Sequence, residues 1–490
     1  MHQIQNTATN NQLSDQGLLP RRCSDSESVD DDGLLPKRAG TVWSACVFLT
    51  TAIVASPLFL SLPGNVAQLE WVAGPAVIIF FSLVTFYTSA LLCACYRSPV
   101  TSKRNHTYMD AIRSNLDGAK VKICLVIQYL NLLAAASEYT VFAALMMMHV
   151  ATDIKYWLSK CRNAADHACY VNPMPYFMAF AVAQIILFQI PKFPPLRMSF
   201  SILCLIMFLL YSGIGLGLAI AKVAGMHGIY YTDLPLTDGN NTTTPAQKIL
   251  KIIRAVGDLA HAYDLSAVLI ETIDTVKSPP LEAETIMKKA TRRSLILTTF
   301  VCMLHGCLLF AAFGNNVSPR VFLLHGFYKP YRQIDMIASA AIVIQFSGGY
   351  QIYLLPILTM VEETLGERFP DNEFITKDIK IPTGCKLNLF RLVWRTLFVI
   401  TTTVLSMFLT IYVDLLKLFQ ILAFWSIAVY FPVEMYMVQK KIPKWSKRWI
   451  CLQILSVGWL IVTIATAAAS SVDLFSTGSN YYDPFKPKYF

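Results

Sequence analysis

The sequence predicts an all-α polytopic membrane protein with eleven transmembrane helices. Apolar residues make up 55% of the 490-residue chain and charged residues only 15%, whereas roughly a quarter of a soluble globular protein is charged. The mean hydropathy is +0.48. Apolar stretches of about 20 residues, the length at which a helix crosses a bilayer, recur along nearly the whole chain. These observations favour one membrane-embedded bundle over a set of soluble domains.

The organisation is expected to be simple, with one membrane domain between two tails. Residues 1–40 are polar, include SDSESVDDD and lack the apolar core of a secretory signal peptide, so we expect a disordered cytosolic tail. The transmembrane domain covers 41–471, and 472–490 form a short extracellular tail. The predicted spans are residues 42–62, 71–95, 121–150, 174–190, 198–221, 249–272, 294–313, 334–361, 390–412, 416–438 and 449–471.

The distribution of positive charge among the loops predicts the orientation of the chain in the membrane. Beside the basic tail, segments 97–122, 275–293, 366–391 and 440–448 hold six, five, five and five Lys or Arg, whereas the intervening segments hold at most three. Basic loops stay in the cytoplasm, so the amino terminus is predicted inside and, after eleven crossings, the carboxyl terminus outside. The net charge of +10 is therefore ascribed to loops on one side and not to a nucleic-acid surface.

Cysteines and sequons add little chemistry. Most cysteines fall inside apolar spans, where they act as small apolar residues, and no CxxC pair or His/Cys cluster predicts a metal. Cys161 and Cys169 share an outside segment, where they either pair or stay free. The sequons at Asn240, Asn241 and Asn316 fall outside, whereas Asn105 falls inside, where no sugar is added.

Two spans contain features that a plain bilayer helix does not carry. In span 1, AIVASPLFLSLPGN (52–65) places Ala55, Ser56 and Pro57 in mid-helix, where proline removes a backbone donor. In span 6, GDLAHAYDLSAVLIE (257–271) carries four ionisable groups, although one charge at the bilayer centre costs about 2.5–3.5 kcal/mol on insertion scales. Such features persist in lipid only where they are buried in protein or line a cavity.

Spans 1 and 6 are five apart, so they cross the membrane in opposite senses. This predicts an inverted repeat of five plus five helices with one appended, in which the first helix of each repeat is broken at a substrate cavity. On a continuous helix, His261, Asp264 and Glu271 would share one face. Two interpretations stay open for His261 and Asp264: a structural hydrogen-bonded pair, or a proton or substrate site. Glu138 of span 3 is a further intramembrane acid, and Asp258 and Glu271 either join the site or lie solvated near the membrane surface.

Several stretches resemble the plant amino acid permeases of the amino acid/auxin permease family, from about residue 41 to the end. They include WVAGPAVIIFFSLVTFYTSALLCACYRS, GDLAHAY, LIETIDTVKSPPLEAETIMKKAT and YFPVEMYMVQKKIPKWSKRW. The resemblance implies proton-coupled uptake of amino acids across the plasma membrane, with the proton as coupling ion and no other cofactor. It also implies a leucine-transporter-like fold that binds substrate between spans 1, 3, 6 and 8.

The departures from that family fall at the expected pocket. The usual IGSGVLSL of span 1 is VASPLFLSL here, FAYSYS of span 6 is HAYDLS, and Gln345 of span 8 stands where histidine is usual. The substrate-binding candidates are Ala55, Ser56, Pro57, Tyr139, His261, Tyr263, Asp264 and Gln345. The proton-coupling candidates are Asp264, His261 and Glu138, the last in place of a glycine.

The leading interpretation is therefore a proton-coupled amino acid symporter in the plasma membrane. The alternatives are a non-transporting amino acid sensor that keeps the scaffold, and a transporter of a related solute such as auxin. An enzyme is disfavoured because no nucleophile–base constellation or metal motif occurs in the sequence.

Overall fold

The computed structural model describes residues 40–99, 104–157, 172–189, 194–225, 237–238, 241–242, 244–277, 283–314, 332–376, 378–380, 386–409 and 413–476. Cys161 and Cys169, like the sequon asparagines Asn240 and Asn316, lie outside the described residues. Asn105, the sequon predicted inside, is buried, and its side chain donates to the Cys95 carbonyl at 2.9 Å.

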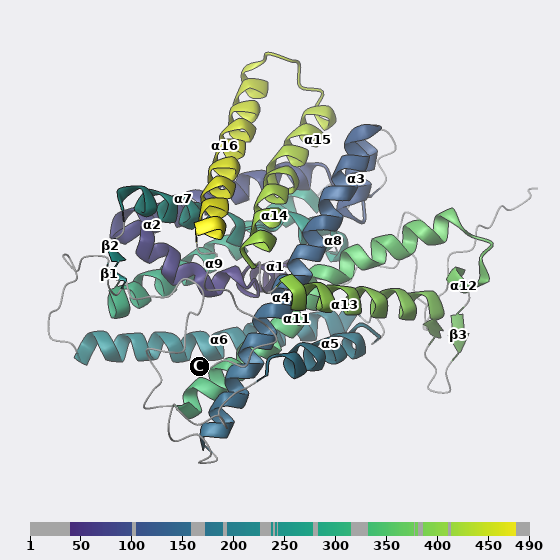
Figure 1. Cartoon of the computed structure of the whole chain (residues 1–490). Helices are drawn as coiled ribbons and strands as arrows, with labels where there is room; N and C mark the ends of the chain where they lie inside the picture. The colour runs from purple at the N-terminus through teal and green to yellow at the C-terminus, as the bar shows by residue number, and fades with distance from the viewer. Residues whose placement is uncertain are drawn as a thin grey trace, which may run out of the picture.

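The described chain is almost entirely helical (Figure 1). Two small antiparallel ribbons pair β1 (Thr237–Asp238) with β2 (Asn241–Thr242) and β3 (Asp378–Lys380) with β4 (Lys386–Asn388). In chain order the helices are α1 (Val42–Val54), α2 (Leu58–Ala94), α3 (Tyr108–Asn115), α4 (Ala119–Trp157), α5 (Met174–Gln189), α6 (Pro194–Gly225), α7 (Pro245–Ala262), α8 (Ser266–Thr275), α9 (Ala283–Phe313), α11 (Arg332–Arg368), α12 (Glu373–Thr376), α13 (Leu389–Leu409), α14 (Val413–Trp425), the π-helix η4 (Ser426–Tyr430), α15 (Phe431–Gln439) and α16 (Lys447–Ser476).

Each of the eleven predicted stretches overlaps one of these helices, or two or three joined by an interruption. Eight helices within the described residues are long and apolar enough to cross a bilayer, namely parts of α2, α4, α6, α9, α11, α13, the α14–α15 stretch and α16. Helices α1 and α5 are apolar but shorter. The chain is thus a multi-pass membrane protein by composition and helix length, and the count of eleven crossings stays a prediction.

Both interruptions foreseen in spans 1 and 6 are present in the structure. The first separates α1 from α2 at residues 55–57, and the second separates α7 from α8 at residues 263–265. A third lies within α2 at Glu70, whose φ of 65° and ψ of −177° divide the end of span 1 from the start of span 2. A fourth is the π-turn η4 within span 10, which comes just before Pro432. Proline lacks the amide that a regular turn requires, and π-turns are often found at functional sites.

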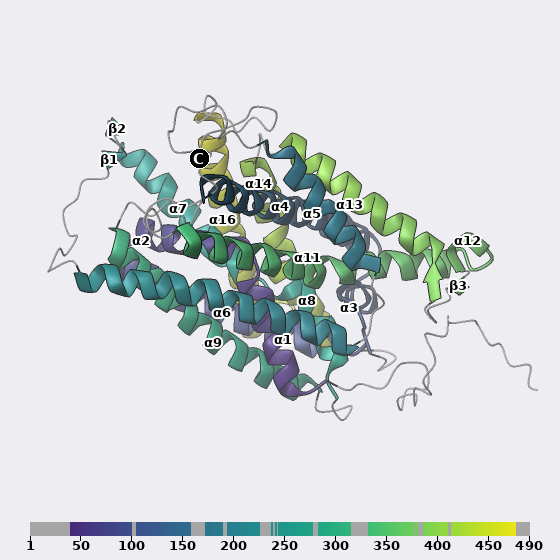
Figure 2. The ribbon, with the colours of Figure 1, turned by 90° about the horizontal axis from the view of Figure 1, so that it is seen from below.

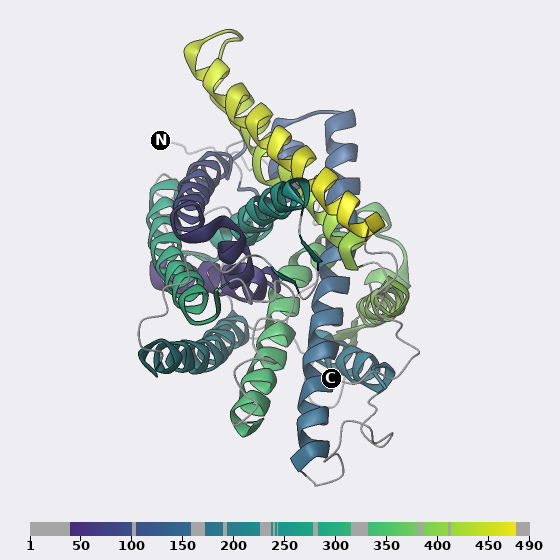
Figure 3. The same cartoon turned by 60° about the vertical axis from the view of Figure 1, so that its left-hand side comes forward.

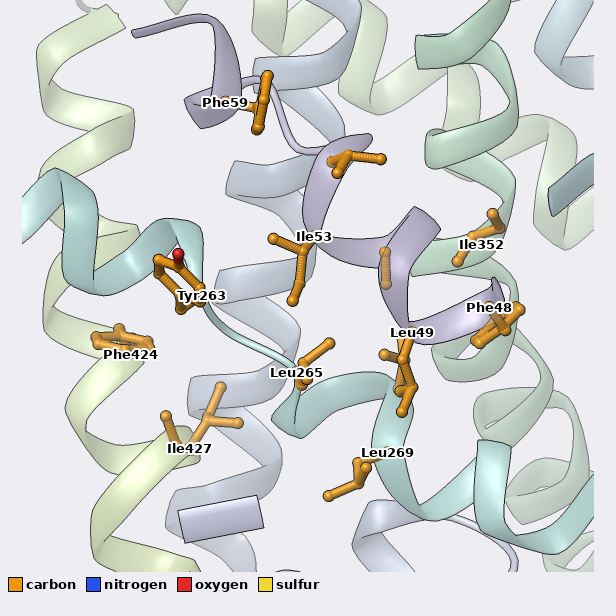
Figure 4. Packing of buried hydrophobic residues seen from close by; sticks show 14 of the residues in the cluster. Phe48, Leu49, Ile53, Phe59, Tyr263, Leu265, Leu269, Ile352, Phe424 and Ile427 are labelled. Carbon is orange, nitrogen blue, oxygen red and sulfur yellow. The ribbon is translucent and has the colours of Figure 1, made fainter. Parts of the chain in front are cut away.

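Packing brings helices from both halves of the chain together. Helix α2 lies along α9 and α7, and α11 lies along α4 and α6. Figure 2 shows α6 between α9 and α11, and Figure 3 shows α4 running lengthwise through the bundle. The largest cluster of buried apolar side chains includes residues beside both interruptions, among them Ile53 and Leu265, which Figure 4 shows directed toward one another. The two breaks therefore lie in the core of the molecule.

Candidate substrate site

The first break is buried and internally hydrogen-bonded. Ala55 and Pro57 are buried, and Ser56 is partly exposed. The Ser56 hydroxyl accepts a hydrogen bond from the Leu58 amide at 3.3 Å, which satisfies one donor freed by the interruption.

The second break places a carboxylate at the start of a helix. Asp264 is buried, and its Oδ1 accepts the Ser266 amide at 2.9 Å, at the amino terminus of α8. The partial positive charge of a helix amino terminus favours an anion there. The single face expected for His261, Asp264 and Glu271 is wrong, because the chain leaves the helical path at residues 263–265 and the spacing does not carry across the break.

Helix α11 connects with the first break through two positions one turn apart. The side-chain Nε2 of Gln345 donates to the Val54 carbonyl at 2.7 Å, at the end of α1. Gly349 lets the backbones approach closely, since a Cβ added there would lie 3.1 Å from the Ala55 Cβ and 3.0 Å from Tyr139 Cε1. A side chain at this position would therefore require Ala55 or Tyr139 to shift by a few tenths of an ångström, so the glycine provides space and not backbone freedom.

The same face of α11 reaches the second break. The Tyr353 hydroxyl donates to the Asp264 carbonyl at 3.4 Å, and the Tyr353 ring centroid lies 6.5 Å from that of Tyr139 on α4. Gln345, Gly349 and Tyr353 are four residues apart, so they line one face of the helix. Sequence reasoning missed Gly349 and Tyr353, although the stretch QFSGGYQIY carried both the glycine and the spacing.

Two predicted site residues point elsewhere. The Tyr263 hydroxyl donates to Thr299 Oγ1 at 3.4 Å, and Thr299 donates in turn to Ser82 Oγ at 2.7 Å, on the α9 and α2 side. The His261 ring packs edge-on against Phe424 of α14, with centroids 5.1 Å apart. His261 also borders a cavity of about 10 Å³ between α7, α14 and α16, close to the smallest volume that holds one water.

Six of the eight substrate candidates thus fall into two groups, and Ser56 and Pro57 lie at the first break itself. Ala55, Tyr139, Asp264 and Gln345 gather around one face of α11, whereas His261 and Tyr263 face other helices. Glu138 is 5% exposed and precedes Tyr139 on α4. The hydrogen bond or proton shared by His261 and Asp264 stays a prediction.

A cluster of polar and charged side chains joins the end of α8 to the segment that follows α2. Near the end of α8, Asp274 accepts the Tyr96 hydroxyl at Oδ1 (2.8 Å) and contacts His106 Nδ1 at Oδ2 (2.8 Å). The Arg104 guanidinium lies 3.8 Å from Asp274 Oδ1 and is 1% exposed. We call these four residues the Asp274 cluster. Asp274 belongs to the last turn of α8, whereas Tyr96, Arg104 and His106 follow α2, and all four lie outside the predicted spans 2 and 6.

Backbone hydrogen bonds also join the residue before α1 to the end of α8. Gly40 donates its amide to the Thr275 carbonyl at 2.9 Å and accepts the Lys277 amide at 2.8 Å. Gly40 and Val276 thereby form a short parallel bridge. A Cβ at residue 40 would lie 2.7 Å from the Thr275 carbonyl oxygen, so the start of span 1 approaches the end of span 6 closely.

Charge stabilises the Asp274 cluster. Burial opposes it, but the hydrogen bond and charge of Asp274 raise the pKa of His106 above its usual value. Burial likewise raises the pKa of Asp274, but His106, Tyr96 and Arg104 outweigh it and hold that pKa below its usual value. Each partner therefore favours the charged form of the other, as expected for an ion pair.

The comparisons with known proteins agree with this architecture. Residues 38–476 match the family model described as transmembrane amino acid transporter protein. The chain belongs to this family. This family member is 46% identical to amino acid permease 3 of Arabidopsis thaliana over 460 residues, which cover 92% of this chain and 94% of that one. It is 44% identical to amino acid permease 2 of the same plant over 462 residues, covering 92% and 91%.

The resemblance to plant amino acid permeases that the motifs predicted is therefore confirmed, and so is the expectation that the family is one of transporters and not of enzymes. Among solved structures, MhsT in complex with L-phenylalanine gives a TM-score of 0.52 at 12% identity, covering 88% of this chain and all of that one. At that identity the likeness concerns the fold alone. Within the described residues, no three His, Cys, Asp or Glu side chains gather as a metal site requires.

Proposed function

We propose that this family member is a proton-coupled symporter that imports amino acids across the plasma membrane by alternating access. The observation that carries the proposal is the face of α11 that contacts both breaks, through Gln345 to Val54 and through Tyr353 to Asp264. Breaks in the first helix of each repeat are where such transporters bind substrate and coupling ion. The amino acid cargo is supported by family membership.

The proposed topology has eleven crossings, arranged as a leucine-transporter-like five-plus-five inverted repeat with one helix appended. Helices α7 and α8 together make one crossing, and α1 joins the first part of α2 in another. The amino terminus is cytoplasmic and the carboxyl terminus extracellular, which the basic loops support. Helix α16 continues to Ser476, so the extracellular tail begins a few residues after the predicted 472. An epitope at the carboxyl terminus should be accessible on intact cells, and one in the amino-terminal tail should not.

In this proposal, transport alternates between a state closed on the cytoplasmic side and a state closed on the opposite side. On the cytoplasmic side, the Gly40–Val276 bridge and the Asp274 cluster join the ends of spans 1, 2 and 6. On the other side, Lys248 at the start of α7 pairs with Glu70 at 3.4 Å, and both side chains are exposed. An exposed ion pair contributes little, about 0–1 kcal/mol. The outer contact is therefore expected to break more readily than the inner one.

The proton is assigned to Asp264, His261 or Glu138. Asp264 is the leading candidate because it lies at the break itself and its carbonyl is held by Tyr353. A buried carboxyl can exchange a proton when substrate changes its surroundings. Symport requires substrate to bind more tightly when Asp264 is protonated. A substrate carboxylate near Asp264 would favour the neutral carboxyl in this way, because two like charges repel, and so couple cargo to proton.

Uptake of radiolabelled amino acids in a transport-deficient host, measured at an acidic and a neutral external pH, tests the proposal. We expect uptake to rise at acidic pH and to be abolished by Ser56→Trp with surface expression retained. Ser114→Trp, on α3 away from both breaks, is the matched control and should leave uptake intact. Absence of uptake for every amino acid, despite surface expression, would instead favour a sensor, and uptake of auxin alone a related carrier.

A further inference from the structure

The turn that joins α15 to α16 carries a dense positive charge. Residues 440–449 read KKIPKWSKRW and contain no acid. We call this segment the basic turn. In Figures 1 and 3 it lies at the projecting end of the α15–α16 pair. Its cations are all exposed: Lys440, Lys441, Lys444, Lys447 and Arg448.

The cations of the basic turn have no carboxylate partner among the residues that the structure describes. Within the described part of the chain, none of the five forms an ion pair with a carboxylate. The acid on α15, Glu434, is instead paired with Lys120 of α4 at 2.6 Å. Five like charges that repel one another over nine residues are therefore available to an external anion.

The basic turn also presents two aromatic rings in an ordered backbone. Trp445 is 78% exposed and has a φ of +67°, which is uncommon for a bulky residue. Its ring centroid lies 5.3 Å from that of Trp449. Ser446 fixes the start of α16, since its Oγ accepts the Trp449 amide at 3.2 Å, while the Ile442 amide donates to the Met437 carbonyl at 3.0 Å.

The two flanking helices place the basic turn at a membrane surface. Leu418–Gln439 and Lys447–Val472 are both long and apolar enough to cross a bilayer, so the seven residues between them lie at its boundary. Tryptophan prefers the headgroup level of a bilayer, and clustered Lys and Arg beside a span attract anionic lipids. An exposed tryptophan among cations that form no ion pair within the described part of the chain combines both preferences.

We propose that the basic turn is a binding site for anionic phospholipid headgroups, with Trp445 and Trp449 seated among them. The cations contact the phosphate and carboxylate groups, and the two indoles fix the depth of the turn in the interface. The site is independent of substrate coupling and rests only on the described turn and on the multi-pass character of the chain.

The test uses the full-length protein in nanodiscs of phosphatidylcholine with a minor fraction of brominated phosphatidylserine. Bromine quenches nearby indoles, and the difference between the wild type and W445F/W449F isolates the two rings of the turn from the other tryptophans. We expect K444Q/K447Q/R448Q to reduce this quenching strongly, since each cation near an anionic surface is worth about fivefold in affinity. Added salt should reduce it as well.

A matched control neutralises three exposed cations at the start of α9, in K289Q/R292Q/R293Q. The proposal predicts unchanged quenching in this variant. An equal loss of quenching in both triple variants would mean that general surface charge, and not a site at the basic turn, attracts the lipid. No loss of quenching in either variant would also overturn the proposal. If the wild type shows quenching only after residues 1–39 are removed, the amino-terminal tail and not lipid occupies the turn in the full-length protein, and the lipid proposal is wrong.

Discussion

Replacing Asp274 by asparagine should weaken the Asp274 cluster, and with it the neighbouring Gly40–Val276 bridge, while preserving the shape of the side chain. Asparagine keeps an acceptor for the Tyr96 hydroxyl, which lies 2.8 Å from Asp274 Oδ1. It removes the charge that faces His106 at 2.8 Å and Arg104 at 3.8 Å. The variant therefore isolates the electrostatic part of the Asp274 cluster.

The size of the effect follows from the exposure of the partners. A hydrogen bond to a charged group contributes about 1.5–3 kcal/mol. The side chains of His106 and Asp274 are 33% and 25% exposed, so solvent screens their attraction and the lower part of this range applies. We expect the opening equilibrium at Gly40 and Lys277 to increase roughly tenfold, at about 1.4 kcal/mol per factor of ten.

The pH dependence has a definite sign. The pKa of His106 is raised, so the stabilisation it gives the closed form is complete below the usual histidine value and is lost as pH rises through the raised value. The pKa of Asp274 is lowered, so its contribution is present above the usual value near 3.8 and is lost only in stronger acid. Of the two groups, His106 is the one whose contribution is lost as pH rises, and Asp110 and Arg104 also act on its pKa, in opposite senses. Rising pH should therefore favour opening at this end of the bundle.

Hydrogen exchange measured by mass spectrometry provides the assay, because the amides of Gly40 and Lys277 close the bridge. Rates are corrected for intrinsic exchange and compared on both sides of neutrality. Glu70→Gln, which breaks the exposed pair at the other end, is the control and should leave these amides unchanged. Equal protection in the wild type and Asp274→Asn, at either pH, would refute the closure assigned to the cluster.

Two further predictions concern stability and coupling. Arg395 is 2% exposed and binds both oxygens of Glu362 at 2.7 and 3.0 Å, so Arg395→Met should lower stability by about 3–5 kcal/mol in thermal denaturation monitored in detergent. Arg391 is exposed and contacts the same Glu362 carboxylate, so Arg391→Met should lower stability by less than about 1 kcal/mol. Similar losses of stability in both variants would contradict the larger contribution assigned to the buried Arg395. Asp264→Asn keeps an acceptor for the Ser266 amide, so this variant should fold normally while uptake loses its pH dependence. Asp264→Ala leaves that amide unsatisfied and should lower the stability of the protein by about 1–3 kcal/mol. An unchanged pH profile of uptake in Asp264→Asn would exclude a proton-coupling role for Asp264.

The sequence alone determined where helices form and where two of them break. Apolar runs and turn-forming residues are local, so the predicted stretches coincide with helices, and Pro57 marks the first interruption because it has no amide to donate. The second interruption followed from the inverted repeat predicted by spans 1 and 6, and the ionisable residues of span 6 indicated that this stretch faces a cavity and not lipid. The family was also evident from contiguous motifs.

Only the tertiary structure decided which side chains meet. Gln345 reaches Val54 across 291 positions of sequence, and Asp274 meets Tyr96 across 178. Such contacts depend on how whole helices pack, which no local pattern specifies. For the same reason, the structure directs His261 toward Phe424 and turns Asp264 to the start of α8, although the two residues are only three apart in the chain. A break in the helix reorients every side chain that follows it, and its direction is set by the neighbouring helices.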